Sequence, residues 1–110
     1  MGLINALLGL IQGNQKQFIA HEDILVDVRS PEEFASGNIE GSINVPVNRI
    51  FVGMRKITPN LNAKIVVYCA SGMRSSKARK ALMQMGYNNV VNGGGIHRVA
   101  RNLQNGIKKS

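Results

Sequence analysis

Apolar residues along this chain gather in short runs that alternate with segments of mixed polarity. Residues 23–28 and 64–68 are largely apolar runs of strand length, which are typical of strands buried on both faces of a sheet. Residues 42–47 form another short extended segment, in which Pro46 indicates a turn or a sheet margin. Residues 88–92 carry the last strand signal, and we expect a turn at the three glycines that follow.

Helix signals lie between these strand signals. Ser30 is a suitable N-cap, Pro31 fits the first helical position, and Gly37 is a suitable stop. Asn48 is predicted to cap a second helix over residues 48–57. The two remaining helices are predicted over residues 75–85 and 96–103.

Strands and helices that alternate through short connections predict an α/β fold. We expect a central parallel sheet of four to five strands with helices on both faces. The chain of 110 residues is long enough for one core, and we assign that domain to residues 17–110.

Residues 1–16 are predicted to form a separate amphipathic helix, because Leu or Ile at positions 3, 4, 7, 8 and 11 share one helical face. This apolar run is shorter than the ~20 residues that a membrane span needs, so we expect no transmembrane segment. Three surfaces could cover the apolar face: the domain itself, a second copy in a homodimer, or a membrane. We favour the domain, since no Lys or Arg precedes Lys16 to bind anionic lipid.

The chain carries a formal net charge of +8, which raises the question of nucleic acid. Its basic residues are spread along the chain and cluster only within residues 74–80. Trp is absent and Tyr and Phe are few, so bases would find few aromatic side chains on which to stack. The charge therefore favours a small anion over nucleic acid as the ligand.

The sequence contains one cysteine, Cys69, and two histidines. A single cysteine excludes an internal disulfide, and this set of residues does not suit a structural zinc site. We expect neither a metal nor a cofactor. A lone thiol favours a reducing compartment, and we expect a cytoplasmic protein.

Cys69 follows directly after a predicted buried strand, at the end of a parallel sheet where ligands bind. The small residues among positions 70–73 let successive backbone N–H groups turn inward as an anion-binding nest. Ser75 or Ser76 can start the next helix, whose N-terminus favours negative charge, and Arg74 adds a full positive charge. Cys69 could instead be one more buried apolar residue, but this setting favours a reactive thiolate.

Three segments, residues 24–46, 64–75 and 90–96, resemble the signature segments of the rhodanese-like (thiosulfate sulfurtransferase) family. The resemblance extends over about residues 24–103. It implies a small α/β domain in which Cys69 accepts a sulfane sulfur as a persulfide and passes it to a nucleophilic acceptor.

The resemblance also implies roles for the neighbours of Cys69. The predicted cradle for the transferred sulfur consists of Ala70, Ser71, Gly72, Met73, Arg74 and Ser75. Asp27 and Arg29 would support the site as a charged pair, and we favour a contact that stabilises the fold over direct catalysis.

The chain departs from the family pattern at three positions. Asn38 stands where relatives often carry His, Val99 where they carry Trp, and Ala70 where some members that use thiosulfate carry a basic side chain. We therefore expect thiosulfate to be a poor surrogate for the natural donor.

Two other functions remain as alternatives. Cysteine phosphatases and some arsenate reductases of similar shape have a longer loop, whereas here four residues separate Cys69 from Arg74. The shorter loop fits one sulfur atom better than a tetrahedral oxyanion. A non-catalytic rhodanese-like module that binds proteins is the other alternative, and the retained cysteine and loop speak against it.

The partners follow from the expected cycle. The donor is a small anion such as thiosulfate. Because no second cysteine can resolve the persulfide, the acceptor must be external: a thiol, cyanide or a partner protein's cysteine. Lys77, Arg79 and Lys80 are expected to steer an acidic partner towards the loop.

Overall fold

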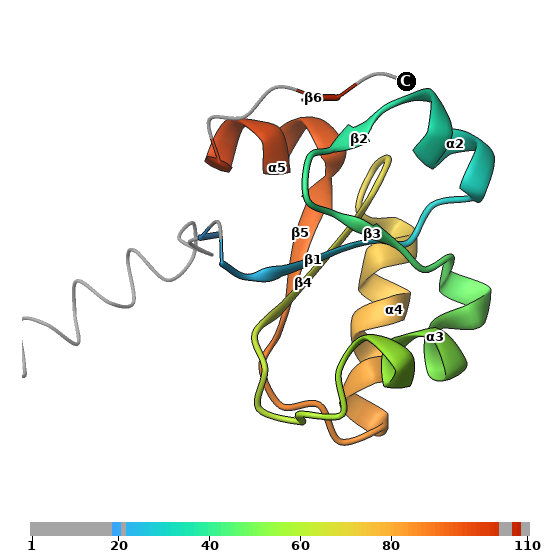
Figure 1. Ribbon diagram of the computed structural model, residues 1–110, viewed down its shortest axis with the longest axis vertical. Coiled ribbons are helices and arrows are strands. Elements are labelled where there is room, and N and C mark those ends of the chain that lie inside the picture. Colours follow the sequence, from blue (N-terminus) through green and yellow to red (C-terminus); the bar gives the residue numbers. More distant parts are fainter. Residues whose placement is uncertain (1–18, 21, 104–106, 109–110) are drawn as a thin grey trace, which may run out of the picture.

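The computed structural model describes residues 19–20, 22–103 and 107–108, the last two by their backbone alone (Figure 1). A parallel four-stranded sheet forms its centre, with the strand order β3-β1-β4-β5. The strands are β1 (Ile24–Asp27), β3 (Ile43–Asn44), β4 (Ile65–Cys69) and β5 (Val90–Gly95). The predicted parallel α/β sheet is confirmed.

Helices cover both faces of this sheet, also as predicted (Figure 1). On one face lie α3 (Ile50–Ile57) and α4 (Met73–Gln84), and on the other lies α5 (Ile96–Leu103). The side chains of β4 alternate between the two cores: Val67 and Cys69 pack under α3 and α4, whereas Tyr68 packs under α5. Every residue of β4 is buried, which explains its continuous apolar run.

A short helix and a small second sheet complete the described part. The helix α2 (Pro31–Ser36) begins with Ser30 as its N-cap, as predicted. Ser30 Oγ accepts from Glu33 N–H, and the Glu33 carboxylate accepts from Ser30 N–H, which makes a capping box. The strand β2 (Asn38–Ile39) pairs antiparallel with β6 (Ile107–Lys108), a pairing that the sequence pattern does not predict.

The predicted start of the second helix is wrong. Asn48 does not cap α3, because it lies inside a 3₁₀ turn, η1 (Val47–Arg49), that precedes the helix. Pro46 is extended, and its carbonyl then accepts from Arg49 N–H at 2.8 Å, which closes this tighter turn first.

Two further predicted boundaries are wrong. The helix α4 begins at Met73 rather than at Ser75, because Gly72 adopts a positive φ of 103° and turns the chain directly into the helix. The three glycines after Asn92 continue β5 instead of forming a turn. Their lack of side chains allows close packing: a Cβ on Gly95 would lie 2.6 Å from the Ala70 carbonyl oxygen.

The predicted N-terminal helix over residues 1–16 lies outside the described residues, so it and the domain boundary stay predictions. In the part of the chain that the structure describes, no helix has the length and apolar character needed to cross a membrane.

A buried ion pair joins the end of β1 to α2. Arg29 Nη2 lies 2.6 Å from Asp27 Oδ2, and Arg29 Nε donates to both carboxylate oxygens at 2.9 and 3.0 Å. Arg29 Nη2 also donates to the Gly37 carbonyl oxygen at 2.6 Å, where α2 ends. Asp27 is completely buried, so the loss of its partner would leave an uncompensated charge inside the protein.

We therefore expect Arg29→Met to lower the free energy of unfolding by roughly 3–5 kcal/mol in urea titrations at neutral pH. The control is Lys56→Met, an exposed change on α3 that should cost under about 1 kcal/mol. The double variant Asp27→Leu/Arg29→Met should recover much of the loss, because no buried charge is then left alone. Equal losses for Arg29→Met and Lys56→Met would contradict this role.

Candidate active site

Cys69 is the last residue of β4 and is completely buried. The predicted cradle follows it as a tight loop that leads into α4, so the loop and the helix N-terminus converge on Sγ. Gly72 N–H donates to Cys69 Sγ at 2.9 Å, and Ser75 N–H donates to it at 3.4 Å. The Cys69 thiol in turn donates to Ser75 Oγ at 3.5 Å.

Not every residue of the predicted cradle turns its side chain to the sulfur. Met73 is 79% exposed, and Ala70 and Ser71 are also exposed, so these residues shape the loop through their backbone. Only Ser75 is buried together with Cys69. The predicted nest is therefore built from backbone N–H groups, with one hydroxyl added.

The surroundings of Cys69 act on its pKa in opposite directions. Burial raises the pKa of the thiol, because it disfavours the charged form. Hydrogen bonds from the Ser75 hydroxyl, Ser75 N–H, Gly72 N–H and Ser71 N–H lower it, and together they outweigh burial. The pKa of Cys69 is therefore lowered, which favours the nucleophilic thiolate.

Arg74 has a partner that sequence inspection does not reveal. Its Nη1 and Nη2 donate to the two carboxylate oxygens of Glu33 at 2.7 and 3.0 Å. The hydrogen bond from Arg74 is the largest cause that lowers the pKa of Glu33 to about 2. Much of the positive charge expected beside the thiolate is thus matched by a carboxylate from α2.

Asn92 on β5 is a second residue that the sequence pattern did not single out. The Ser75 hydroxyl donates to Asn92 Oδ1 at 2.6 Å, which links β5 to the hydroxyl beside the sulfur. In the sequence, the one feature that could have indicated Asn92 is its position as a polar residue directly after Val90 and Val91. Within the described residues, no three His, Cys, Asp or Glu side chains gather as a possible metal site.

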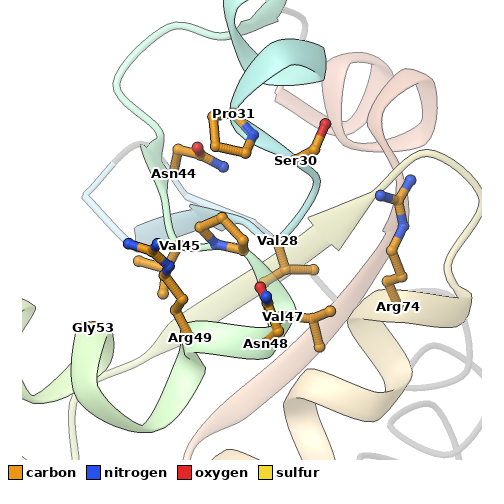
Figure 2. A pocket seen from close by; sticks show the side chains of 11 residues that line it. Val28, Ser30, Pro31, Asn44, Val45, Val47, Asn48, Arg49, Gly53 and Arg74 are labelled. Carbon is orange, nitrogen blue, oxygen red and sulfur yellow. The ribbon is translucent and has the colours of Figure 1, made fainter.

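A groove of about 620 Å³ lies next to the cradle (Figure 2). Val28, which belongs to the same buried cluster as Cys69, lines part of its wall. Arg49 and Arg74 stand on opposite sides of the groove in Figure 2. The remaining lining residues are Ser30, Pro31, Asn44, Val45, Pro46, Val47, Asn48 and Gly53.

The Glu33–Arg74 pair makes a pH-dependent contribution to stability. Folding lowers the pKa of Glu33 from 4.5 to about 2, so the contribution is full above pH 4.5 and is lost as pH falls through 2. We expect Glu33→Gln to unfold at a lower urea concentration than wild type at pH 6, with the gap narrowing steadily below pH 4.5. The exposed neighbour Glu32, changed to Gln, serves as the control. A gap that stays constant with pH would show that the pair does not act through its charge.

Comparison with known proteins gives a consistent result. The model of the rhodanese-like domain matches residues 10–109. Thiosulfate sulfurtransferase PspE of Escherichia coli is 35% identical over 75 residues, which cover 68% of this chain and 72% of that protein. A sulfurtransferase of Allochromatium vinosum is 43% identical over 82 residues, which cover 73% and 75% of the two chains.

A solved structure, described as a rhodanese with anions from E. coli, superposes with a TM-score of 0.71 at 30% identity. The match covers 80% of this chain and 99% of that one. With a family model that spans most of its length, a parallel α/β fold and a cysteine at the end of the central strand, the chain belongs to the rhodanese-like domain family.

Proposed function

We propose that Cys69 is the sulfur carrier of this sulfurtransferase and that the loop after it holds the transferred sulfur. The observation that carries the proposal is the convergence of two backbone donors, Gly72 N–H and Ser75 N–H, on one buried sulfur atom, with the Ser75 hydroxyl beside it. These groups stabilise negative charge on Sγ, which the nucleophile needs.

The proposed cycle has two displacements. The Cys69 thiolate attacks the outer sulfur of a donor such as thiosulfate, the S–S bond of the donor breaks, and sulfite leaves with the electron pair. The outer sulfur of the resulting Cys69 persulfide is then attacked by an acceptor nucleophile, and the Cys69 thiolate leaves. Atoms and charge balance in each step, and neither step requires a cofactor.

The acceptor in this cycle is an external thiol, cyanide or a protein cysteine, because Cys69 is the only cysteine in the chain. We propose that the groove beside Arg74 holds the part of an acidic acceptor that does not react. Arg49 supports this assignment: it is exposed, it lines the groove, and no carboxylate among the described residues lies within ion-pair distance of it.

The predicted steering residues differ in their surroundings. Lys77 and Lys80 are exposed on α4 and are free to attract an acidic partner over a distance. Arg79 Nε donates to the Val90 carbonyl oxygen at 2.8 Å, so this side chain also holds the outer edge of the sheet. We keep Lys77 and Lys80 as the steering pair, and a homodimer through residues 1–16 stays a prediction.

Neither alternative function has an observation in its favour. A module used only for binding has no need of several donors aimed at one buried sulfur. The short loop of four residues between Cys69 and Arg74 leaves little room for the oxyanion that a phosphatase binds. We also keep the proposal of a reducing compartment such as the cytoplasm, since Cys69 is free and its role requires a thiol.

We expect wild-type protein incubated with thiosulfate to gain the mass of one sulfur atom, with release of sulfite, and Cys69→Ser to gain none. Intact-mass spectrometry measures the gain. The control is Ser76→Ala, an exposed change two residues past Arg74 that should leave the gain unaffected. A serine variant that still gains sulfur would remove Cys69 from the mechanism.

The groove makes a separate prediction about the acceptor. In Arg49→Gln, we expect the concentration of glutathione that discharges half of the persulfide to rise several-fold, because a cation that faces the acidic thiol is lost. Discharge by the uncharged thiol 2-mercaptoethanol should not change. Arg101→Gln, an exposed change on α5, is the matched control. Equal effects of Arg49→Gln on both thiols would exclude the groove as a site for acidic acceptors.

A further inference from the structure

The hydroxyl of Ser75 has a single proton and several acceptors within reach. Ser75 Oγ lies 2.6 Å from Asn92 Oδ1, 3.1 Å from the Gly72 carbonyl oxygen and 3.5 Å from Cys69 Sγ. Ser75 is completely buried, so bulk water does not supply a further donor. The direction of this one proton therefore decides which neighbour the hydroxyl stabilises.

The orientation of the Asn92 amide follows from its other contacts. Gly94 N–H donates to Asn92 Oδ1 at 2.9 Å, and Asn92 Nδ2 donates to the Gly72 carbonyl oxygen at 3.5 Å. The opposite orientation would place two donors, Nδ2 and Gly94 N–H, against each other. Oδ1 therefore faces Ser75, and since a carbonyl oxygen only accepts, the hydroxyl must be the donor in this contact.

This arrangement suits the neutral thiol. Ser75 Oγ accepts from the Cys69 thiol while it donates to Asn92 Oδ1. Once the thiol proton leaves to solvent, Sγ can only accept, and the charged sulfur becomes the stronger acceptor for the Ser75 proton. Asn92 Oδ1 loses little in this exchange, because it retains the N–H of Gly94.

The fold aims Asn92 at this position. Along β5, Asn92 pairs with Val67, but the next paired residues are Gly94 and Tyr68, so Gly93 is an extra residue in the ladder. Such a bulge redirects the side chains beside it and is often found next to active sites. Here it brings the Asn92 amide beneath the first turn of α4, next to Ser75 and Gly72.

We propose that Asn92 is a positioning residue for sulfur transfer, which holds the Ser75 proton while Cys69 Sγ is neutral and yields it when Sγ becomes negative. The inference rests on the proposed role of Cys69 as the carrier. In the persulfide, the charge lies on the outer sulfur and the hydroxyl donates to Asn92. When the acceptor attacks the outer sulfur, the S–S electron pair moves to Sγ, and the Ser75 proton turns back to stabilise it.

Removal of Asn92 Oδ1 takes away the nearest competing acceptor, so the Ser75 proton should turn to the thiolate more readily; the Gly72 carbonyl oxygen, at 3.1 Å, remains as an uncharged competitor. We expect Asn92→Leu, which has a similar volume but no acceptor, to lower the pKa of Cys69 by roughly half a unit to one unit. Ser75→Ala should raise the pKa. In the double variant, the pKa should equal that of Ser75→Ala, since Asn92 then has no hydroxyl through which to act.

The measurement is the rate of alkylation of Cys69 by iodoacetamide as a function of pH, and it is unambiguous because the chain has one cysteine. It requires no sulfur donor, so it separates a failure of this inference from a failure of the proposed function. The variants retain the charged groups near this end of the sheet: Arg74 on α4, Glu33 on α2, Asp27 and Arg29 at the end of β1, and Arg98 on α5 beside Gly94.

Two results would overturn the proposal: an unchanged pKa in Asn92→Leu, or the same downward shift with and without the Ser75 hydroxyl. If Asn92→Leu does not fold, Asn92→Asp takes its place, since it retains the shape and the acceptor. It should raise the pKa of Cys69 more in the presence of Ser75 than in Ser75→Ala, because a carboxylate holds the hydroxyl proton more tightly. Equal rises in both backgrounds would show that the new carboxylate acts on Cys69 through its charge alone and not through the Ser75 hydroxyl, which would contradict the proposal.

Discussion

The hydrogen bond from Gly72 N–H to Cys69 Sγ, at 2.9 Å, joins the central strand to the helix that follows it. For this N–H to point back at the sulfur, the chain must reverse within three residues, which the positive φ of Gly72 permits. The same reversal starts α4 at once and brings the N–H and the hydroxyl of Ser75 to the sulfur. It also places the Ala70 carbonyl so close to β5 that only glycine fits at position 95.

Dipoles rather than full charges dominate the surroundings of the thiol. Two of the arginines near this end of the sheet are matched by carboxylates, Arg29 by Asp27 and Arg74 by Glu33. The causes that lower the pKa of Cys69 are hydrogen bonds from N–H groups and one hydroxyl. Since these donors are fixed by the backbone and by burial, they need little reorganisation when charge develops on the sulfur.

In the proposed cycle, both displacements require Sγ to carry negative charge, first as the attacking group and later as the leaving group. In the first step Sγ is the nucleophile, and in the second it is the leaving group, so negative charge resides on it at the start and at the end of the cycle. Between the two steps Sγ is neutral. A hydroxyl that can turn between the sulfur and Asn92 follows this change, whereas the backbone donors remain in place. The groove beside Arg74 is the place that we propose for an acceptor outside the buried core.

The sequence by itself determined the elements whose signals are local. The buried run before Cys69, the N-cap at Ser30 and the alternation of strands and helices each depend on neighbouring residues, and each was predicted. The position of Cys69 at the end of a parallel strand, and a nest of backbone N–H groups after it, followed from the same patterns. Local signals failed for residues that are common in more than one structure. Asn48 was predicted to cap a helix but lies in a 3₁₀ turn, and the three glycines were predicted to form a turn but continue β5.

Only the tertiary structure decided the contacts between distant segments. Glu33 and Arg74 are 41 residues apart, and Ser75 and Asn92 are 17 apart, so no local pattern connects either pair. The Glu33–Arg74 pair forms because the parallel sheet brings the segments that follow its strands to one edge, and the Ser75–Asn92 pair forms because the first turn of α4 lies against β5. The net charge near the sulfur depends on the Glu33–Arg74 pair, and the direction of the Ser75 proton depends on Asn92. Both contacts exist only in the folded chain.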